Sequence, residues 1–549
     1  MTNNNSFKLN NIETNNKKRT MNIINESNNK RRKTTNTLRE PENYKDIQNL
    51  IDRKEWINAV NEELSNMKNL NVFNTIKYIP KNANVISSRW IFKYKRNANG
   101  EITKRKARLV ARGFTQEFGI DFHDTFAPTL KHDSIRILTS IAAQNNFNIE
   151  QIDINAAYLN AKLSENIYMK PPEGHPDFNR KYWKLNKAIY GLKQSGREWN
   201  KEINKFLTKI GLRRMVSEPC IYVKNGKNKN ILCIVGIYVD DILIAGKENE
   251  IKIIKEYFKR KYKIKEIGDV DFVIGIKFVK HKNGYFMHQR RYIIEVLEKF
   301  NMNNEKPLRN TKPITDDKLR NIKFNQTTYR SAIGNLLYIA ICTRPDILFS
   351  VSKAARKSNN PNMEDWNNVV RILRYLKGTT SYGINYTRKL GIEAFVDADF
   401  AGDTETRRST TGFLVTMGNA PTSWCSKLQH CVSTSTAESE YYSLSECGKH
   451  CIWYLNLMKE LYYNIKCIKI KIDNKAAIFN SKNQSINPKT KHIDIRIHYI
   501  REIINKNFIK LEYIQSQNNL ADGFTKYLNN TLMEKFRNSL LYKIEDLKF

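Results

Sequence analysis

The stretch Ile237-Tyr238-Val239-Asp240-Asp241-Ile242-Leu243-Ile244 places two adjacent carboxylates between two apolar runs. The runs are rich in β-branched residues, so they predict two buried strands joined by a very tight turn. A turn tolerates one Asp, but two like charges between buried strands repel each other unless positive charge lies nearby. A divalent cation held by oxygen ligands would supply that charge. On this stretch alone a polar hairpin tip is the favoured interpretation, so other parts of the chain must decide.

A third carboxylate, Asp153, lies in another predicted strand that starts near Phe147. A helix predicted over residues 135–143 precedes this strand. An Asp within an apolar strand is costly unless it is paired or bound to a metal. Asp153 is therefore the natural third member of a group with Asp240 and Asp241.

The composition indicates a partner with many negative charges. The 549 residues include 93 Lys and Arg against 55 Asp and Glu, a net charge of +38. Such a field favours nucleic acid. A solvated basic surface, or codon bias that enriches Lys, Asn and Ile, is the alternative. The length suggests about three or four domains, and 40% hydrophobic residues suffice to build them.

Residues 1–40 are polar and basic and are expected to be a disordered tail. Their cluster Lys30-Arg31-Arg32-Lys33 is interpreted as a nuclear import signal, a nucleic-acid arm or a segment without function. No signal peptide and no run of membrane-spanning length occur, so no membrane partner is expected. The eight cysteines do not form C-x-x-C pairs, so a structural zinc is not expected. These features predict an intracellular protein, in a cytoplasmic particle or also in the nucleus.

Two strand-like runs at residues 85–95 and 107–114 alternate basic and apolar residues. A hairpin of such strands has Lys and Arg on one face and core residues on the other. The basic face suits the phosphates of a template or a nucleotide. A solvated edge strand guarded by Lys is an equally weighted alternative.

The last third of the chain changes to a β-β-β-α-β-α-β-α pattern. The third strand is expected at residues 431–435, and the run Ser433-Thr434-Ser435-Thr436 is expected to cap a long helix from about Ala437. Four acids each lie at the end of a predicted element: Asp397, Glu438, Asp473 and Asp522.

A series of motifs from about Glu40 to Lys526 resembles the reverse transcriptase–ribonuclease H region of copia-type LTR retrotransposon polyproteins. The motifs follow the family's order over nearly the whole chain. They are KARLVARGFTQEFGIDFHDTFAP (106–128), QIDINAAYLNAKL (151–163), YGLKQSGREW (190–199), YVDD (238–241), TRPDI (343–347), RYLKGT (374–379), DADFAGD (397–403), STAESEY (435–441), DNKAA (473–477), KHIDIRIHYIRE (491–502) and ADGFTK (521–526).

The resemblance implies a polymerase site in which Asp153 and Asp240 ligate two Mg²⁺ ions and Asp241 completes the acidic group, with Mn²⁺ as an alternative metal. Two such ions stabilise both ends of an in-line phosphoryl transfer. By the same resemblance, Tyr158 packs under the incoming sugar and excludes a 2′-hydroxyl. Three further residues are expected to hold the base, template or triphosphate: Lys106, Arg108 and Gln194.

The resemblance also implies a ribonuclease H site, in which two Mg²⁺ ions are bound by the acids Asp397, Glu438, Asp473 and Asp522. His492 matches a histidine of the family, and Asp494 either assists or has a structural role in its helix. The implied partners are an RNA template, a DNA primer, an RNA–DNA hybrid and deoxynucleoside triphosphates.

The implied fold class is α/β: a right-hand polymerase of fingers, palm and thumb, a helical connection and a ribonuclease H-like mixed-sheet domain. We expect a tail at 1–40, the polymerase at 41–300, the connection at 301–388, the ribonuclease H-like domain at 389–530 and a C-terminal tail at 531–549. Integrase and protease signatures are not found. The chain is therefore expected to be the C-terminal part of a polyprotein or a degraded genomic copy. A catalytically silent relic that only binds nucleic acid is the alternative function.

Overall fold

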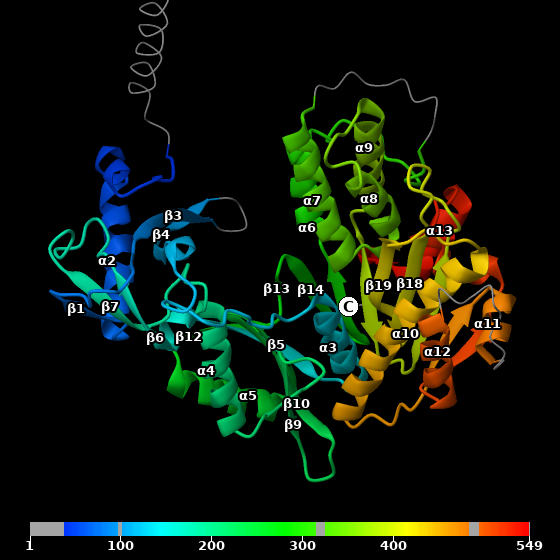
Figure 1. The fold of residues 1–549 in the computed structure, drawn as a ribbon, viewed down its shortest axis with the longest axis horizontal. Coiled ribbons are helices and arrows are strands. Elements are labelled where there is room, and N and C mark those ends of the chain that lie inside the picture. Colours follow the sequence, from blue (N-terminus) through cyan, green and yellow to red (C-terminus); the bar gives the residue numbers. More distant parts are fainter. Residues whose placement is uncertain (1–37, 97–100, 314–323, 483–493, 548–549) are drawn as a thin grey trace, which may run out of the picture. The chain divides into compact units, whose positions relative to one another are not determined.

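The computed structural model describes residues 38–96, 101–313, 324–482 and 494–547. The predicted basic cluster at 30–33 and His492 lie outside these ranges. The chain forms two compact units: unit 1 comprises Met1–Ala127 and Ala156–Ile203, and unit 2 comprises Pro128–Asn155 and Asn204–Phe549. Both units combine helices and sheets, which confirms the α/β class (Figure 1). In the described ranges, none of the helices has the length and apolar character needed to cross a membrane.

Unit 1 contains a four-stranded sheet in the order β1-β7-β6-β2 and a separate hairpin of β3 and β4. The amphipathic helix predicted near its start is α2, whose Trp56 packs on Phe92 and Tyr94 of β3 at ring-centroid distances of 5.5 and 5.1 Å. The elements are η1 (Lys45–Asn49), α2 (Arg53–Asn69), β1 (Phe73–Ile76), β2 (Val85–Ile86), β3 (Ser88–Arg96), β4 (Ile102–Ala111), η2 (Gly113–Thr115), η3 (Ala157–Asn160), β6 (Lys162–Met169) and β7 (Tyr182–Lys187), and α4 (Ser195–Lys209) begins in this unit.

The β3–β4 hairpin has the two faces that its sequence predicts. On β3, Trp90 and Phe92 are buried, whereas the next residue, Lys93, is exposed. Lys93 lies opposite Lys106 across the two strands. One face of the hairpin therefore belongs to the core of unit 1, and the other carries cations.

Unit 2 begins with a six-stranded sheet in the order β12-β5-β11-β10-β9-β8. The opening stretch of the sequence forms its central hairpin, in which Tyr238 pairs with Asp241. The turn is as tight as predicted, and Val239 within it has a positive φ of 55°. The elements are α3 (His132–Gln144), β5 (Asn148–Ile154), β8 (Arg213–Arg214), β9 (Ile221–Asn225), β10 (Ile231–Tyr238), β11 (Asp241–Gly246), α5 (Glu248–Lys261) and β12 (Ile264–Asp269).

A second sheet in unit 2 has the order β13-β14-β15-β16-β22 and draws on distant parts of the chain. Its strands come from three of the predicted segments: β13, β14 and β15 from 41–300, β16 from 301–388 and β22 from 531–549. The boundaries of the predicted domains stay a prediction. The elements of this region are β13 (Phe272–Val273), β14 (Ile276–His281), β15 (Gly284–His288), α6 (Arg290–Lys299), α7 (Gln326–Cys342), η4 (Pro345–Ile347), α8 (Leu348–Ala355), α9 (Met363–Lys377) and β16 (Tyr382–Thr387).

The segment after residue 530 is not a tail, so that prediction is wrong. It forms α13 (Asn530–Leu540), β22 (Tyr542–Lys543) and η8 (Ile544–Asp546). Met533, Phe536 and Leu540 recur at three- and four-residue steps and are buried in the core. An amphipathic helix of this kind folds because it covers apolar surface of its neighbours.

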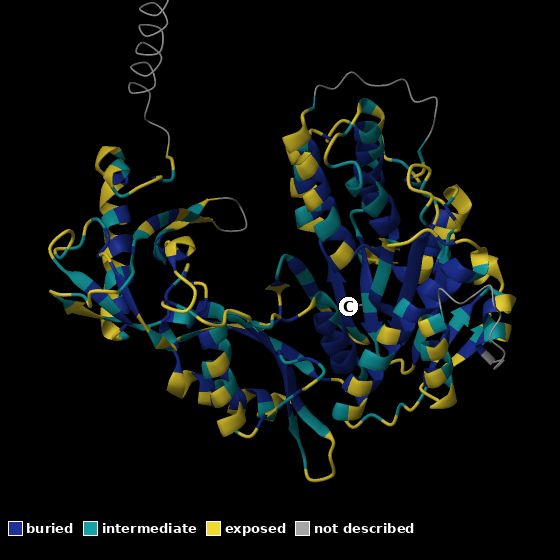
Figure 2. Ribbon diagram, viewed as in Figure 1, coloured by how far each residue is buried: buried dark blue, intermediate teal, exposed yellow. Residues whose placement is uncertain are grey.

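The third sheet has the order β19-β18-β17-β20-β21. The predicted β-β-β-α-β-α-β-α pattern differs from it in two places: the described residues between β20 and β21 form two helices, α11 and α12, and the last predicted helix is the short 3-10 turn η7. The third strand lies earlier than expected, at 420–428 rather than 431–435. Strand β18 is buried along its whole length, beneath α10 (Figure 2). The elements are β17 (Ile392–Ala398), β18 (Thr410–Met417), β19 (Ala420–Leu428), α10 (Thr436–Glu460), β20 (Ile468–Ile472), α11 (Lys475–Lys482), α12 (Asp494–Asn505), β21 (Ile509–Tyr513), η6 (Ser516–Asn518) and η7 (Asp522–Phe524).

Helix α3 joins the three sheets of unit 2 through one hydrophobic core. It packs on β5, β10 and β11 of the first sheet, on β15 and β16 of the second, and on β19 of the third. Its Arg136 is buried and donates hydrogen bonds to the carbonyl oxygens of Thr422 (2.7 Å), Ile341 (2.6 Å) and Cys342 (3.1 Å). Its guanidinium also pairs with Asp133 and stacks on the Trp424 ring at 3.8 Å. Arg136 thus ties α3 to α7 and to β19.

Arg136→Leu should destabilise the protein because it leaves buried carbonyl oxygens and the Asp133 carboxylate without their donor. Breaking a buried pair from one side costs about 3 kcal/mol or more, which chemical denaturation monitored by circular dichroism would measure. Arg291→Leu is the matched control, because Arg291 is exposed and makes only a surface pair with Glu295 on α6. A loss no larger for Arg136→Leu than for Arg291→Leu would contradict this role.

Candidate functional site

The first acidic group comprises Asp153, Asp240 and Asp241. Antiparallel pairing of β5 with β11 places Asp153 directly opposite Asp241. Asp240 is the second residue of the two-residue turn, and Asp241 follows it as the first residue of β11. The backbone N–H of Ile154 donates to the carbonyl oxygen of Asp240 at 2.9 Å, which holds the turn against the end of β5. The structure therefore brings the three predicted carboxylates to the tip of one hairpin.

A buried amide holds one carboxylate of this group. Burial raises the pKa of Asp241, and the negative charges of Asp240 and Asp153 raise it further. Nε2 of Gln151 donates a 3.0 Å hydrogen bond to Asp241, which acts in the opposite direction. The side chain of Gln151 is buried, and its Oε1 atom has no hydrogen-bond partner among the described residues. Gln151 was not predicted, although it lies two residues before Asp153 on the same face of β5.

The second acidic group comprises Asp397, Asp473 and Asp522. One carboxylate oxygen of each lies within 4.8 Å of the others, and in the described part of the chain no other His, Cys, Asp or Glu set is this compact. Asp397 lies near the end of β17 and Asp473 directly follows β20. Because β17 and β20 are parallel neighbours, their carboxyl ends lie at the same edge of the sheet.

The turn that carries Asp522 is held closely to this sheet. Nδ2 of Asn519 donates to the carbonyl oxygen of Val396 in β17 at 2.9 Å. Gly412 of β18 permits the approach, since a Cβ atom there would lie 2.6 Å from Cγ2 of Thr525. Asp522 therefore lies in the 3-10 turn η7, held by this packing, at the place where the last helix of the β-β-β-α-β-α-β-α pattern was predicted.

The second group is strongly strained electrostatically. Burial raises the pKa of Asp397 to about 7, and the neighbouring Asp522 raises it as well. Two positive or donating groups act against this: the Thr525 hydroxyl donates to Asp397, and Nζ of Lys526 lies 2.7 Å from Asp522. Oδ1 of Asp522 remains buried without a hydrogen-bond partner in the described residues.

Glu440 is a further buried acid beside this group, whereas Glu438, the predicted fourth acid, contacts Thr434. Burial raises the pKa of Glu440 to about 9, and its next largest causes are the charges of Asp397 and Asp473. Oε2 of Glu440 is buried and has no described partner. The carboxylate of Glu438 instead accepts hydrogen bonds from the N–H (2.6 Å) and the hydroxyl (2.9 Å) of Thr434.

Helix geometry explains the exchange of these two glutamates. Ser435 is the N-cap of α10 and accepts from the Glu438 N–H, so Glu438 occupies the third helical position of a capping arrangement. Glu440 lies four residues before Leu444, on the stripe that faces the sheet. The S-x-x-E pattern at 435–438 therefore indicates a helix cap. The buried positions Leu444, Cys447 and Cys451 of α10 continue at helical spacing from Glu440 and indicate that Glu440 faces the sheet.

The residues predicted to hold the nucleotide or the template lie in unit 1 and differ in how far they are buried: Tyr158, Lys106, Arg108 and Gln194. The Tyr158 ring contacts the Tyr190 ring edge-on at 5.2 Å, and the Arg108 guanidinium lies 4.7 Å from the centre of the Tyr190 ring. Lys106 and Arg108 alternate along β4 and are half-buried. These three residues are accessible to a ligand.

Gln194 is fully buried and cannot contact a ligand directly, so its predicted role is corrected. Its Oε1 accepts from Nε2 of Gln116 at 3.1 Å, and its Nε2 donates to the carbonyl oxygen of Asp121 at 2.8 Å. Both hydrogen-bonding ends of the side chain are occupied. Gln194 therefore shapes the loop that contains Gln116 and Asp121.

The donor set of the second group fits a divalent cation. Hard cations prefer carboxylate oxygens, and the group offers three close carboxylates and buried, unpartnered oxygens on Asp522 and Glu440. The first group has the same donor type in a wider arrangement. At the second group, a cation could bind Oδ1 of Asp522 and Oε2 of Glu440 without displacing a described hydrogen-bond partner of these two atoms.

Glu440→Gln should weaken cation binding at the second group by about tenfold or more, since supporting carboxylates of metal sites have effects of this size. Glu438→Gln should leave cation binding unchanged and lower only helix stability, by about 1 kcal/mol or less. Titration calorimetry with Mn²⁺ on the full chain, together with thermal unfolding, separates the two effects. Weakened binding by Glu438→Gln with normal binding by Glu440→Gln would restore the original assignment.

Comparison with known proteins identifies the family. The sequence model of the reverse transcriptase (RNA-dependent DNA polymerase) family matches residues 70–315. The retrovirus-related Pol polyprotein from transposon TNT 1-94 of Nicotiana tabacum is 36% identical over 513 residues, which cover 90% of this chain and 38% of that protein. The Pol polyprotein from transposon RE2 of Arabidopsis thaliana is 33% identical and matches 89% of this chain and 34% of its own length. This chain thus spans little more than a third of the two plant polyproteins.

A shorter relative is matched almost completely. A transposon Ty5-1 protein of Saccharomyces cerevisiae is 31% identical over 309 residues, which are 54% of this chain and 98% of that protein. The solved structure of the foamy viral protease-reverse transcriptase in complex with dsDNA covers 87% of this chain and 99% of its own, at 12% identity and a TM-score of 0.44. That structural similarity is too low to support a conclusion. The sequence matches show that the chain belongs to the copia-type retrotransposon Pol protein family and that residues 70–315 carry a reverse transcriptase domain.

Proposed function

We propose that this chain is an RNA-directed DNA polymerase that also hydrolyses the RNA strand of RNA–DNA hybrids. The observation that carries the polymerase activity is the hairpin tip, where Asp153 lies opposite Asp241 and beside Asp240 within the matched family region. The second acidic group supports the hydrolytic activity. Its residues come from β17, β20, α10 and η7.

At the first group, Asp153 and Asp240 would hold the cations, with Mg²⁺ as the proposed metal and Mn²⁺ as an alternative. When bound, a pair of such cations activates the attacking oxygen and neutralises charge at the phosphate in phosphoryl transfer. Asp241 adds negative charge beside the two ligands, and Gln151 fixes the orientation of its carboxylate. In unit 1, Arg108 and Lys106 would bind phosphates, and Tyr158 would contact the sugar of the incoming nucleotide.

At the second group, Asp397, Asp473, Asp522 and Glu440 would hold the metal pair and bind the scissile phosphate of the RNA strand through it. Thr525 and Lys526 orient Asp397 and Asp522 by a hydrogen bond and an ion pair. Selection of the hybrid requires contacts to the 2′-hydroxyls of the RNA. His492 and Asp494 stay predictions as assisting residues.

The proposed partners are an RNA template, a DNA primer, their hybrid and deoxynucleoside triphosphates. The net charge of +38 and the cationic face of the β3–β4 hairpin favour these polyanions. The predicted intracellular location stays a prediction.

A catalytically silent relic that only binds nucleic acid is the second candidate function, and the net charge of +38 by itself requires no more than such binding. A relic would bind hybrids in a salt-sensitive manner. It would neither incorporate nucleotides nor cleave RNA, so either activity above background excludes it.

Asp240→Asn should abolish primer extension on an RNA template and leave hybrid cleavage intact, whereas Asp473→Asn should do the reverse. Each variant removes one carboxylate charge from one group, and losses of about a thousandfold are expected for groups that stabilise transition-state charge. One extension-and-cleavage assay with Mg²⁺ on a primed RNA template measures both activities, and each variant is the other's control for folding. Primer extension that persists in the Asp240→Asn variant would show that the first acidic group does not carry the polymerase activity.

Gln151→Leu should reduce primer extension about tenfold, because the Asp241 carboxylate loses its donor, and should raise the Mg²⁺ concentration required for half-maximal extension. Gln144→Leu is the matched control, since Gln144 on α3 donates only to the Ser140 hydroxyl at 3.3 Å. An unchanged Mg²⁺ requirement in a stably folded Gln151→Leu variant would show that the amide has no positioning role.

A further inference from the structure

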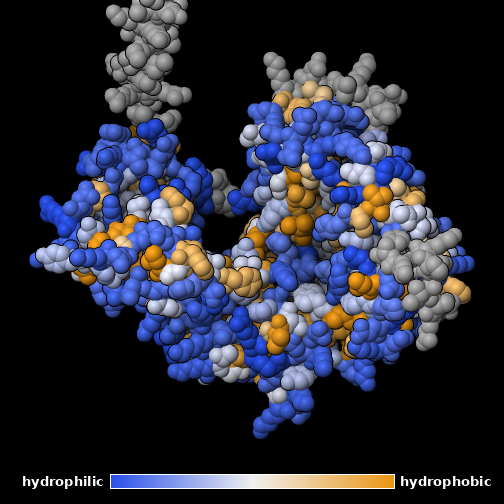
Figure 3. Space-filling view, in the orientation of Figure 1, coloured by the Kyte–Doolittle hydropathy of each residue, from blue (hydrophilic) through white to orange (hydrophobic). Residues whose placement is uncertain are grey.

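The segment of residues 113–127 in unit 1, named here the aromatic loop, presents large apolar side chains to solvent. Phe114, Phe118 and Phe126 are 78%, 74% and 78% exposed. Figure 3 shows a largely hydrophilic surface on which hydrophobic residues are gathered in limited patches. Several exposed rings within one short segment indicate an interaction site rather than scattered surface residues.

The aromatic loop is nevertheless built rigidly. Asp121 is almost completely buried, and its carboxylate accepts hydrogen bonds from Nδ2 of Asn84 at 2.6 Å and from the Glu117 N–H at 2.9 Å. Gln194 and Gln116 add the buried amide contact described above. Nζ of Lys193 also donates to the carbonyl oxygen of Gln116 at 3.3 Å. These hydrogen bonds order residues 116–121 before any ligand binds, which reduces the entropy that this part of the loop loses on binding.

Cations and rings alternate on this part of unit 1. Nζ of Lys193 lies 4.4 Å from the centre of the Phe122 ring, and the Phe118 ring contacts the Phe122 ring edge-on at 5.8 Å. Tyr190 lies three residues before Lys193, outside the aromatic loop, and its ring contacts Arg108 and Tyr158. A series of cationic and aromatic side chains thus extends from the proposed nucleotide side towards the aromatic loop.

The chemistry of this series favours unpaired nucleic acid over a protein partner. Proteins that bind single strands stack successive bases on aromatic side chains and neutralise the phosphates with Lys and Arg. Arg112, at the start of the loop, is exposed and adds another cation. The fully buried core of a protein interface is instead depleted in charge, whereas here Lys193 lies directly on a ring of the loop.

We propose that the aromatic loop binds the unpaired part of the template strand, with Phe114, Phe118 and Phe126 stacking on its bases. This site rests on the proposed function, because the template is the single strand that an RNA-directed polymerase holds. Lys193 and Arg112 bind phosphates beside the stacked bases.

The test compares the full chain with a variant that carries Phe114→Ala and Phe118→Ala. Binding is measured by fluorescence anisotropy to a blunt RNA–DNA duplex and to the same duplex with a single-stranded RNA extension. The variant should bind the extended duplex about tenfold or more weakly, the size expected for lost base stacking, and should bind the blunt duplex as the wild type does.

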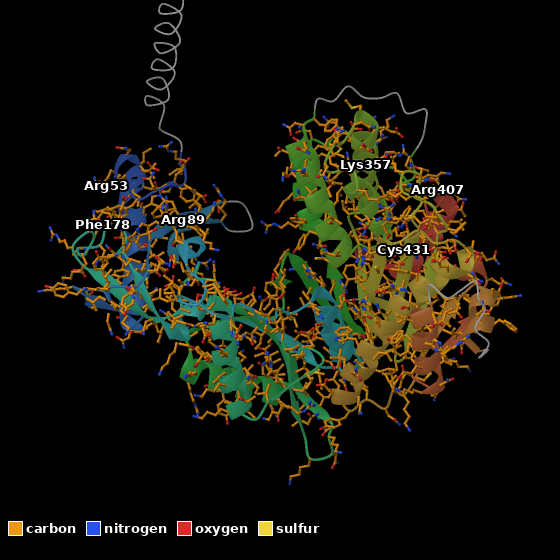
Figure 4. The ribbon with its side chains drawn as sticks, in the orientation of Figure 1. Arg53, Arg89, Phe178, Lys357, Arg407 and Cys431 are labelled. Atoms are coloured by element: carbon orange, nitrogen blue, oxygen red, sulfur yellow. The ribbon has the colours of Figure 1, made fainter. Side chains whose placement is uncertain are left out.

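Phe178→Ala is the matched control, since Phe178 is another exposed phenylalanine of unit 1 outside the loop (Figure 4). It should bind both duplexes normally. A fluorescent adenine analogue placed in the extension gives a second readout, because stacking on a ring quenches its emission. That quenching should be lost in the double variant and kept in Phe178→Ala.

Equal weakening on both duplexes, or no weakening on either, would overturn the proposal. So would a wild-type chain that self-associates through the loop, seen as a larger mass that the double variant loses in sedimentation. The binding assay needs no nucleotide incorporation. A wild type that binds the extension through the loop but extends no primer would overturn the proposed polymerase activity and support the loop as a single-strand site.

Discussion

Repulsion between carboxylates at the ends of buried strands is the constraint on which the structure of unit 2 depends. Burial and neighbouring negative charge raise the pKa of Asp241 at the first group and of Asp397 and Glu440 at the second. The chain offsets part of this cost with an amide from Gln151 and with the Thr525 hydroxyl. Oxygens that remain buried and unpartnered are not explained by the protein alone. At the second group, a bound cation would satisfy the buried oxygens of Asp522 and Glu440 that have no described partner.

Sheet topology turns this constraint into two sites. Antiparallel neighbours β5 and β11 bring Asp153 and Asp241 opposite each other, and parallel neighbours β17 and β20 bring Asp397 and Asp473 to one edge. Helix α3 packs against all three sheets, and the buried guanidinium of Arg136 fixes it there. The strands that carry the two acidic groups therefore share one close-packed hydrophobic core, in which a displacement of one sheet would strain the packing of the others.

The features that local pattern determines were predicted from the sequence: the tight hairpin, the strand that carries Asp153, the two-faced β3–β4 hairpin and the strands β17, β18, β20 and β21 of the third sheet. Prediction failed where two local signals competed. Glu438 and Glu440 are two residues apart at a helix start, and only packing shows that one caps the helix while the other faces the acids. Gln194 lies in a motif of the family, yet its burial depends on Asp121 and Gln116, which are distant in sequence. The C-terminal helix α13 was missed although Met533, Phe536 and Leu540 recur at helical steps, because their burial depends on packing against the rest of unit 2.

Each acidic group is proposed to bind cations. Anomalous diffraction from crystals of the full chain grown with Mn²⁺ and a primed RNA template tests this proposal without measuring activity. We expect one set of anomalous peaks among Asp397, Asp473, Asp522 and Glu440 and another beside Asp153 and Asp240. Crystals that hold Mn²⁺ elsewhere but show no peak at either group would contradict it.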